Sequence, residues 1–168
     1  MSKIGFQEAF QTWLRKIILD SDIETEGLYS TWADKDSEFP YIVYKLESNN
    51  YQPDKIMTES TLTIDIWDYS QLERNVLEIR EQLVELLDGR LVRLDDYETY
   101  FLQVFQTYQE GDIICQAARI DLQSENVIPT DTDNIWRREL QFSVRYDRKR
   151  DISNILDREQ AQPIWDLS

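Results

Sequence analysis

The sequence contains no histidine among its 168 residues. Without histidine, the chain cannot form the Ser–His or Cys–His pairs of nucleophilic enzymes, or a zinc or iron site with histidine ligands. Any metal chemistry would depend on carboxylate ligands, which suit Mg²⁺ or Ca²⁺. We therefore expect a protein that is not an enzyme and that holds no cofactor or metal.

Cysteine, glycine, proline and long apolar runs are also scarce. The single cysteine, Cys115, has no partner for an internal disulfide, which fits a reducing compartment. Only four glycines and four prolines leave little material for a flexible linker. No apolar run approaches the ~20 residues that a membrane span requires, and Glu8 stands where a signal peptide would be apolar. We expect one globular domain over residues 1–146 and no membrane association.

Acidic side chains are abundant and unevenly distributed. The net charge is −15, which argues against general attraction to DNA phosphates. Residues 20–38 are the densest acidic segment, whereas residues 137–168 hold seven of the 18 bases and only six of the 33 acids. The body of the protein is therefore acidic, and a near-neutral C-terminal extension over residues 147–168 begins with Arg148, Lys149 and Arg150 and is expected to contain a short helix.

Hydrophobic periodicity predicts two amphipathic helices. Apolar residues recur at helical spacing over residues 4–20. A second helix is expected to begin at Ser70 as N-cap, with Glu73 completing a capping box. Its apolar stripe includes Leu72 and Val76, and Gly89 supplies the left-handed conformation that ends it.

Alternating apolar and polar residues predict strands in the rest of the chain. The expected strands cover residues 28–32, 41–46, 61–67, 100–108, 113–122 and 136–146. Strand 41–46 is expected in the interior of the sheet because it is apolar on both faces. Helices and strands do not alternate strictly, which favours an α+β fold: a mostly antiparallel, twisted sheet of five or six strands packed by two amphipathic helices.

The short motifs that could carry metal chemistry are incomplete. Asp65 and Asp68 flank Trp67 at the end of a strand, where some nucleases hold Mg²⁺, but such pairs are common by chance. The segment that begins at Asp131 resembles the start of a calcium loop, but Ile135 and Trp136 occupy positions that need a ligand and a glycine. Cys115 lies in an apolar run with no base to activate it, so a core position is expected.

The order of elements resembles a known family. An amphipathic helix, a short strand, the turn Pro40-Tyr41-Ile42-Val43-Tyr44, the strand over residues 61–67 and a helix ending in Leu86-Leu87-Asp88-Gly89 resemble the tail terminator (tail completion) proteins of long-tailed bacteriophages. The resemblance covers about residues 4–146. It implies a structural virion protein whose subunits form a hexameric ring at the head-proximal end of the tail, after synthesis in the host cytoplasm. Its implied partners are the tail tube protein, the head–tail connector protein and DNA that passes through without specific binding.

The implied ring gives roles to particular side chains. Carboxylates lining a channel would repel DNA phosphates and prevent sticking, and basic or aromatic side chains outside the core suit subunit contacts. The candidates for the channel are Asp22, Glu24, Glu26, Asp34, Asp36 and Glu38. The candidates for interfaces are Trp32, Trp67, Arg148, Lys149, Arg150 and Trp165.

Other functions fit the same composition. A DNA-mimic inhibitor of a nucleic-acid enzyme would use exposed carboxylates in place of phosphates, although the 18 bases dilute such an array. Another neck or tail ring protein with the same subunit fold is a second alternative. A carboxylate-metal hydrolase would rest on Asp65 and Asp68 alone.

Overall fold

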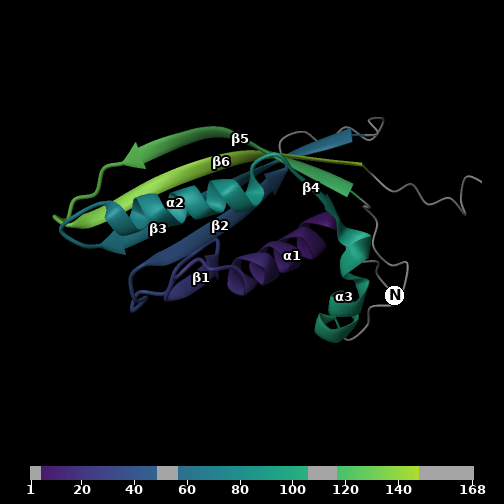
Figure 1. Cartoon of the computed structure of the whole chain (residues 1–168), viewed down its shortest axis with the longest axis horizontal. Helices are drawn as coiled ribbons and strands as arrows, with labels where there is room; N and C mark the ends of the chain where they lie inside the picture. The colour runs from purple at the N-terminus through teal and green to yellow at the C-terminus, as the bar shows by residue number, and fades with distance from the viewer. Residues whose placement is uncertain (1–4, 49–56, 106–116, 148–168) are drawn as a thin grey trace, which may run out of the picture.

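The computed structural model describes residues 5–48, 57–105 and 117–147, and these form an α+β fold with one mixed, curled sheet (Figure 1). The strands are β1 (Gly27–Ser30), β2 (Tyr41–Ser48), β3 (Met57–Tyr69), β4 (Arg90–Arg93), β5 (Ala117–Ile128) and β6 (Ile135–Asp147). Their order across the sheet is β1-β2-β3-β6-β5-β4. Among the described strands only β1 and β2 are parallel, so the expected mostly antiparallel α+β fold is confirmed.

The long strands β3 and β6 form the middle of the sheet. They pair from Met57 opposite Asp147 to Tyr69 opposite Ile135. On β3, Leu62, Ile64 and Ile66 are fully buried, while the alternate residues face the other side. The alternation predicted for this strand is therefore confirmed.

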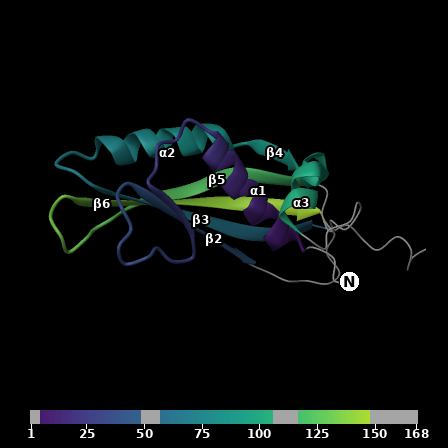
Figure 2. The ribbon, with the colours of Figure 1, turned by 90° about the horizontal axis from the view of Figure 1, so that it is seen from below.

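Three helices cover one face of this sheet. They are α1 (Phe6–Asp20), α2 (Arg74–Leu87) and the short α3 (Glu98–Val104), which follows a 3₁₀ turn over Leu94–Tyr97. Buried residues of all three helices belong to one core with the sheet, and Figure 2 shows α2 running along one side of the strands. The hydrophobic core lies between these helices and the sheet, with Phe10 and Trp13 of α1 and Leu83 of α2 fully buried.

The helix α3 replaces a strand predicted over residues 100–108, and that prediction is wrong over its described part. Phe101 is fully buried, and Tyr97, Tyr100 and Phe105 pack against the core around it. These aromatic residues recur at steps of three and four, which is a helical spacing. The high strand propensity of Tyr and Phe concealed that spacing.

The start of α2 also differs from the prediction. The helix begins at Arg74, so Ser70 is not its N-cap, and Leu72 is 69% exposed. The backbone of Ser70 is used elsewhere: its N–H donates to the Asn134 carbonyl, and its own carbonyl accepts from the indole N–H of Trp136. Glu73 forms an ion pair with Arg138 in place of a capping box.

The end of α2 agrees with the prediction. Gly89 has a φ of +72°, the left-handed conformation expected there. Strand β2 lies inside the sheet as predicted, but helices cover only one of its faces, on which Ile42, Tyr44 and Leu46 are buried.

Several predictions fall outside the described residues. These are residues 106–108 and 113–116 of two predicted strands, Cys115, and the C-terminal extension with Arg148, Lys149, Arg150 and Trp165. None of the helices in the described part combines the length and the hydropathy needed to cross a membrane.

Candidate functional site

The face of the sheet opposite the helices carries a cluster of aromatic side chains. Because Ile42 and Ile66 are buried on the helix side, their neighbours Tyr41 and Trp67 lie on the opposite face, where they pair in register and stack with ring centroids 5.9 Å apart. Three further rings join them, and we call the five residues the aromatic patch: Tyr29, Phe39, Tyr41, Trp67 and Tyr69.

The aromatic patch already holds a guanidinium group. Arg137 of β6 lies opposite Trp67 of β3, with its guanidinium carbon 4.9 Å from the Trp67 ring centroid. Two hydrogen bonds of 3.2 Å join the same guanidinium to the Asp65 carboxylate. Burial raises the pKa of the neighbouring Tyr41 hydroxyl, against the opposing effect of the Arg137 charge. The surface thus combines an aromatic ring with a carboxylate, a pairing that suits arginine.

Beside the patch, residues 31–40 connect β1 to β2, and we call this segment the β1–β2 loop. Thr31 has a φ of 71°, and the Trp32 N–H donates to the Ser30 carbonyl at 2.8 Å, which closes a tight three-residue turn. After this turn, Trp32 is 80% exposed. The loop also carries Asp34, Asp36 and Glu38, all exposed, and extends on the side of the sheet away from the helices (Figure 2).

A second group of acids lies on the helix side of the molecule. Asp22, Glu24 and Glu26 precede β1 and line a groove beside α2, where Glu78 completes a set of four carboxylates. Asn75 and Gln82 of α2 line the same groove. The six acids predicted to face a channel are therefore all exposed, but they divide into two separate triads.

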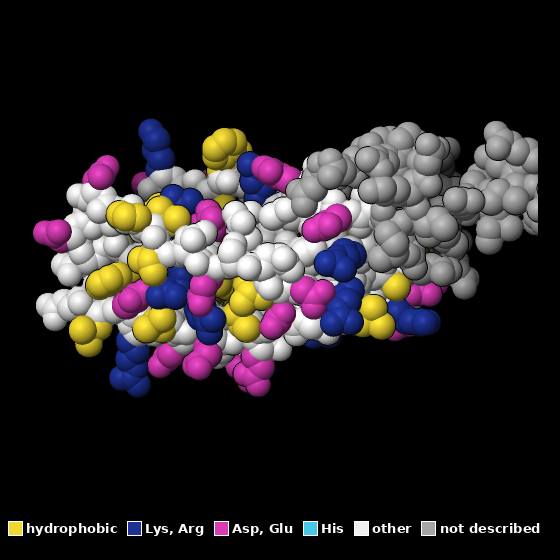
Figure 3. All heavy atoms as spheres, turned by 90° about the horizontal axis from the view of Figure 1, so that it is seen from above, with side chains coloured by type: hydrophobic (Ala, Val, Ile, Leu, Met, Phe, Trp, Pro, Cys, Tyr) yellow, Lys and Arg dark blue, Asp and Glu magenta, His cyan; other side chains and the backbone are white. Residues whose placement is uncertain are grey.

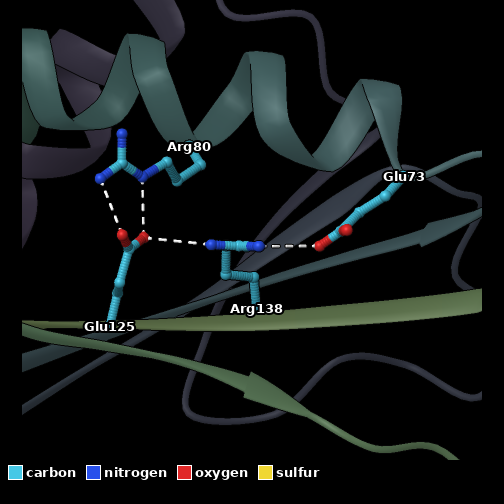
Figure 4. Close-up of polar contacts among 4 residues, drawn as sticks. All are labelled: Glu73, Arg80, Glu125 and Arg138. Atoms are coloured by element: carbon cyan, nitrogen blue, oxygen red, sulfur yellow. Dashed lines mark hydrogen bonds and ion pairs between the residues drawn. The ribbon is translucent and has the colours of Figure 1, made fainter.

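Between α2 and the sheet, four charged side chains form a continuous ion-pair network (Figure 4). Arg80 of α2 donates two hydrogen bonds to Glu125 of β5, at 2.7 and 2.9 Å. Arg138 of β6 lies between Glu125, at 3.4 Å, and Glu73, at 2.9 Å. The hydrogen bond from Arg80 is the main cause that lowers the pKa of the Glu125 carboxyl, and Arg138 adds to it.

This network connects α2 to the sheet, and each of its four side chains pairs with at least one of the others. The Arg138 side chain is only 15% exposed, and its two carboxylate partners are 26% and 32% exposed. Its position on the helix side of β6 follows from the strand alternation, because it shares a face with the buried Leu140 and Phe142. The network is therefore a structural feature.

The pair Asp65 and Asp68 does not form a metal site. Asp65 lies on the open face and is bound to Arg137, whereas Asp68 is 2% exposed on the helix side and accepts a hydrogen bond from Asn75. Three residues apart on a strand, the two carboxylates point to opposite faces. Among residues 5–48, 57–105 and 117–147, no group of three His, Cys, Asp or Glu side chains could hold a metal ion.

Charges of both signs are mixed on the face of the molecule drawn in Figure 3. Acidic and basic side chains alternate there with hydrophobic ones, so the described part of this face presents no unbroken array of one sign. Exposed apolar side chains of α2 and β5 include Leu77, 42% exposed, and Val127, 57% exposed.

Comparison with models of known protein families gives no match, and comparison with curated protein sequences gives none either.

The sequence identified some of these residues singly but not their grouping. Trp32 and Trp67 were candidates for an interface, and both are at least partly exposed on or beside the open face. Tyr29, Phe39 and Tyr69 were not singled out, because their proximity depends on the pairing of β1, β2 and β3. The alternation of apolar residues along 41–46 and 61–67 was the available signal, since it places Tyr41 and Trp67 on one face.

Proposed function

We propose that the chain is the subunit of a homo-oligomeric ring in a virion, a tail terminator that caps the tail tube and joins the tail to the head. By resemblance the ring is a hexamer, and its partners are the tail tube protein and the head–tail connector protein. DNA passes through the ring without specific binding. The protein acts in assembly and carries out no catalysis.

The observation that carries this proposal is the aromatic patch on an open sheet face. Helices cover one face of the sheet, while the other presents five aromatic rings beside an 80% exposed tryptophan. Aromatic residues are enriched at the centres of protein interfaces. Together with the element order of the resemblance, this surface supports a subunit that is completed by contact with other protein chains.

For the channel, we assign the groove triad Asp22, Glu24 and Glu26. These exposed carboxylates lie next to Glu78, so a contiguous negative surface is formed by the segment before β1 and by α2. A ring that turns this surface inward would repel passing phosphates. The second triad has a different environment, and its role is argued in the next subsection.

Electron microscopy of the purified full chain, combined with DNA binding, tests this proposal. We expect closed rings with a central channel. In rings of the double variant Asp22→Lys and Glu24→Lys, the channel should attract linear duplex DNA but not closed circular DNA, which cannot thread a preformed ring. The control Asp131→Lys and Asp133→Lys changes the same charge on the exposed segment between β5 and β6, and should not distinguish the two DNA forms. Absence of rings in the wild-type protein would contradict the proposal.

The groove carboxylates also favour a second candidate, the DNA-mimic inhibitor. Four acids line one groove, which is the local arrangement that a phosphate mimic needs. The mixed charges of the face in Figure 3 argue against a long array. A monomer in solution that inhibits a nucleic-acid enzyme, and loses inhibition in Asp22→Lys and Glu24→Lys, would replace the ring with this second function.

A further inference from the structure

We propose that the aromatic patch and the β1–β2 loop of one subunit bind the basic run Arg148, Lys149 and Arg150 of a second copy of this chain. The inference rests on the proposed ring and specifies which surfaces join neighbouring subunits. It is argued from the chemistry of the surface, from charge, and from the reach of the chain.

The surface has the chemistry that binds arginine and lysine. Arg137 shows the arrangement within the subunit, because its guanidinium lies over Trp67 and pairs with Asp65. Outside that contact, the surface still presents apolar rings and carboxylates to solvent. Tyr69 is 59% exposed and Trp32 80% exposed, and Asp34, Asp36 and Glu38 are exposed on the same loop as Trp32. Cations bind favourably over aromatic rings, and nearby carboxylates add charge-assisted hydrogen bonds.

Charge identifies the segment of the second copy that would bind this surface. In a chain of net charge −15, residues 148–150 are the only place where three bases stand in succession. The β1–β2 loop holds three acids and one base, Lys35, and is therefore net negative, so it is complementary in charge to the three bases of residues 148–150.

The reach of the chain excludes binding within one subunit. Arg137 lies beside the patch, and Asp147 lies at the other end of β6, so ten residues of strand separate them by roughly 33 Å. Residues 148–150 follow Asp147 directly and extend at most about 10 Å from it. The basic run therefore cannot meet its own patch, and the contact must be made with another copy.

A contact of this kind joins unlike surfaces and so has direction. The acidic aromatic end of one subunit meets the basic end of the next, which is a heterologous, head-to-tail interface. Repetition of such an interface gives a closed ring when the rotation closes. The inferred contact thus accounts for how this chain could build the proposed ring with a single type of interface.

Exchange of charges between subunits tests the contact. One variant carries Asp34→Lys, Asp36→Lys and Glu38→Lys, and the other carries Arg148→Glu, Lys149→Glu and Arg150→Glu. In sedimentation velocity, we expect each variant alone to need at least a tenfold higher concentration than the wild type to assemble. An equimolar mixture should assemble at the wild-type concentration, because each variant then meets complementary charges on its neighbours.

The control reverses three charges elsewhere. Asp22→Lys, Glu24→Lys and Glu26→Lys should assemble like the wild type, and this variant should not rescue the variant of residues 148–150. The aromatic contribution is tested with Trp32→Ala, which should weaken assembly severalfold. Leu72→Ala, a change at a residue 69% exposed beside α2, should leave assembly unchanged.

The outcomes separate this inference from the proposed function. A wild-type protein that stays monomeric contradicts both. A wild-type ring that persists in either charge-reversed variant, or a mixture that fails to assemble, overturns the contact while the ring remains. Binding of an unrelated basic peptide without effect on assembly would assign the surface to a different partner and would also overturn the inferred contact.

Discussion

Replacing Arg138 by methionine should destabilise the subunit, because Arg138 connects α2 to the sheet. Its guanidinium pairs with Glu73 at 2.9 Å and Glu125 at 3.4 Å and is only 15% exposed. Methionine keeps a long apolar stem in place and removes the charge. The substitution therefore isolates the electrostatic part of the network.

The magnitude follows from the burial of the group. Removing one partner of a fully buried ion pair costs about 3–5 kcal/mol, and an exposed pair contributes about 0–1 kcal/mol. Arg138 lies between these limits, since its carboxylate partners are 26% and 32% exposed and Glu125 retains Arg80. The substitution also removes the buried Nε of Arg138, which has no hydrogen-bond partner among the described residues. Removing this unsatisfied donor offsets part of the cost. We expect a loss of about 2 kcal/mol in the free energy of unfolding.

Chemical and thermal denaturation measure this loss. A change of about 2 kcal/mol corresponds to a fall of about 4–8 °C in melting temperature for a domain of this size. Arg74→Met is the matched control, because that side chain is 81% exposed and pairs with Glu78 one turn along α2. It should cost less than about 0.5 kcal/mol. Equal effects of the two substitutions would refute the reasoning that burial gives the network its energetic weight.

Three further predictions concern other parts of the fold. Gly89→Ala should cost about 1 kcal/mol in unfolding free energy, because φ is +72° there while a Cβ would meet no atom within 4 Å; an unchanged melting temperature would contradict the left-handed helix end. Phe101→Ala should cost about 3–5 kcal/mol, whereas Leu102→Ala, at a residue 49% exposed, should stay within about 0.5 kcal/mol; the reverse order in denaturation would contradict α3. Glu125→Gln should destabilise at neutral pH. The folded pKa of Glu125 is below the ordinary 4.5, so its stabilisation is present above that pH and is lost as the pH falls through the folded pKa. A difference between wild type and variant that persists undiminished well below pH 4.5 would contradict this.

Periodicity in the sequence predicts those parts of the fold in which one face alone is buried. The apolar stripe of α1 and the alternation along β3 and β6 each follow one period, so the prediction needed no tertiary information. Gly89 was predicted for a similar reason, because a left-handed position at a helix end favours glycine.

Tertiary contacts decide the features that the sequence did not predict. Phe101 and its aromatic neighbours have high strand propensity. The segment nevertheless forms a helix, and the face that carries these aromatic residues packs against the core. Ser70 has the right residue type for an N-cap, but its backbone pairs with Asn134 and Trp136, and the helix starts four residues later. The aromatic patch could not be predicted without the strand order, because its residues come from β1, β2, β3 and the loop between β1 and β2.

The mass of the purified full chain in native solution tests the central claim most directly. Our account predicts a closed assembly of about six times the 20.2 kDa chain, which stays constant over a range of protein concentrations and dissociates as salt screens the contacts between subunits. A monomer or dimer at all concentrations and salt conditions would contradict the ring.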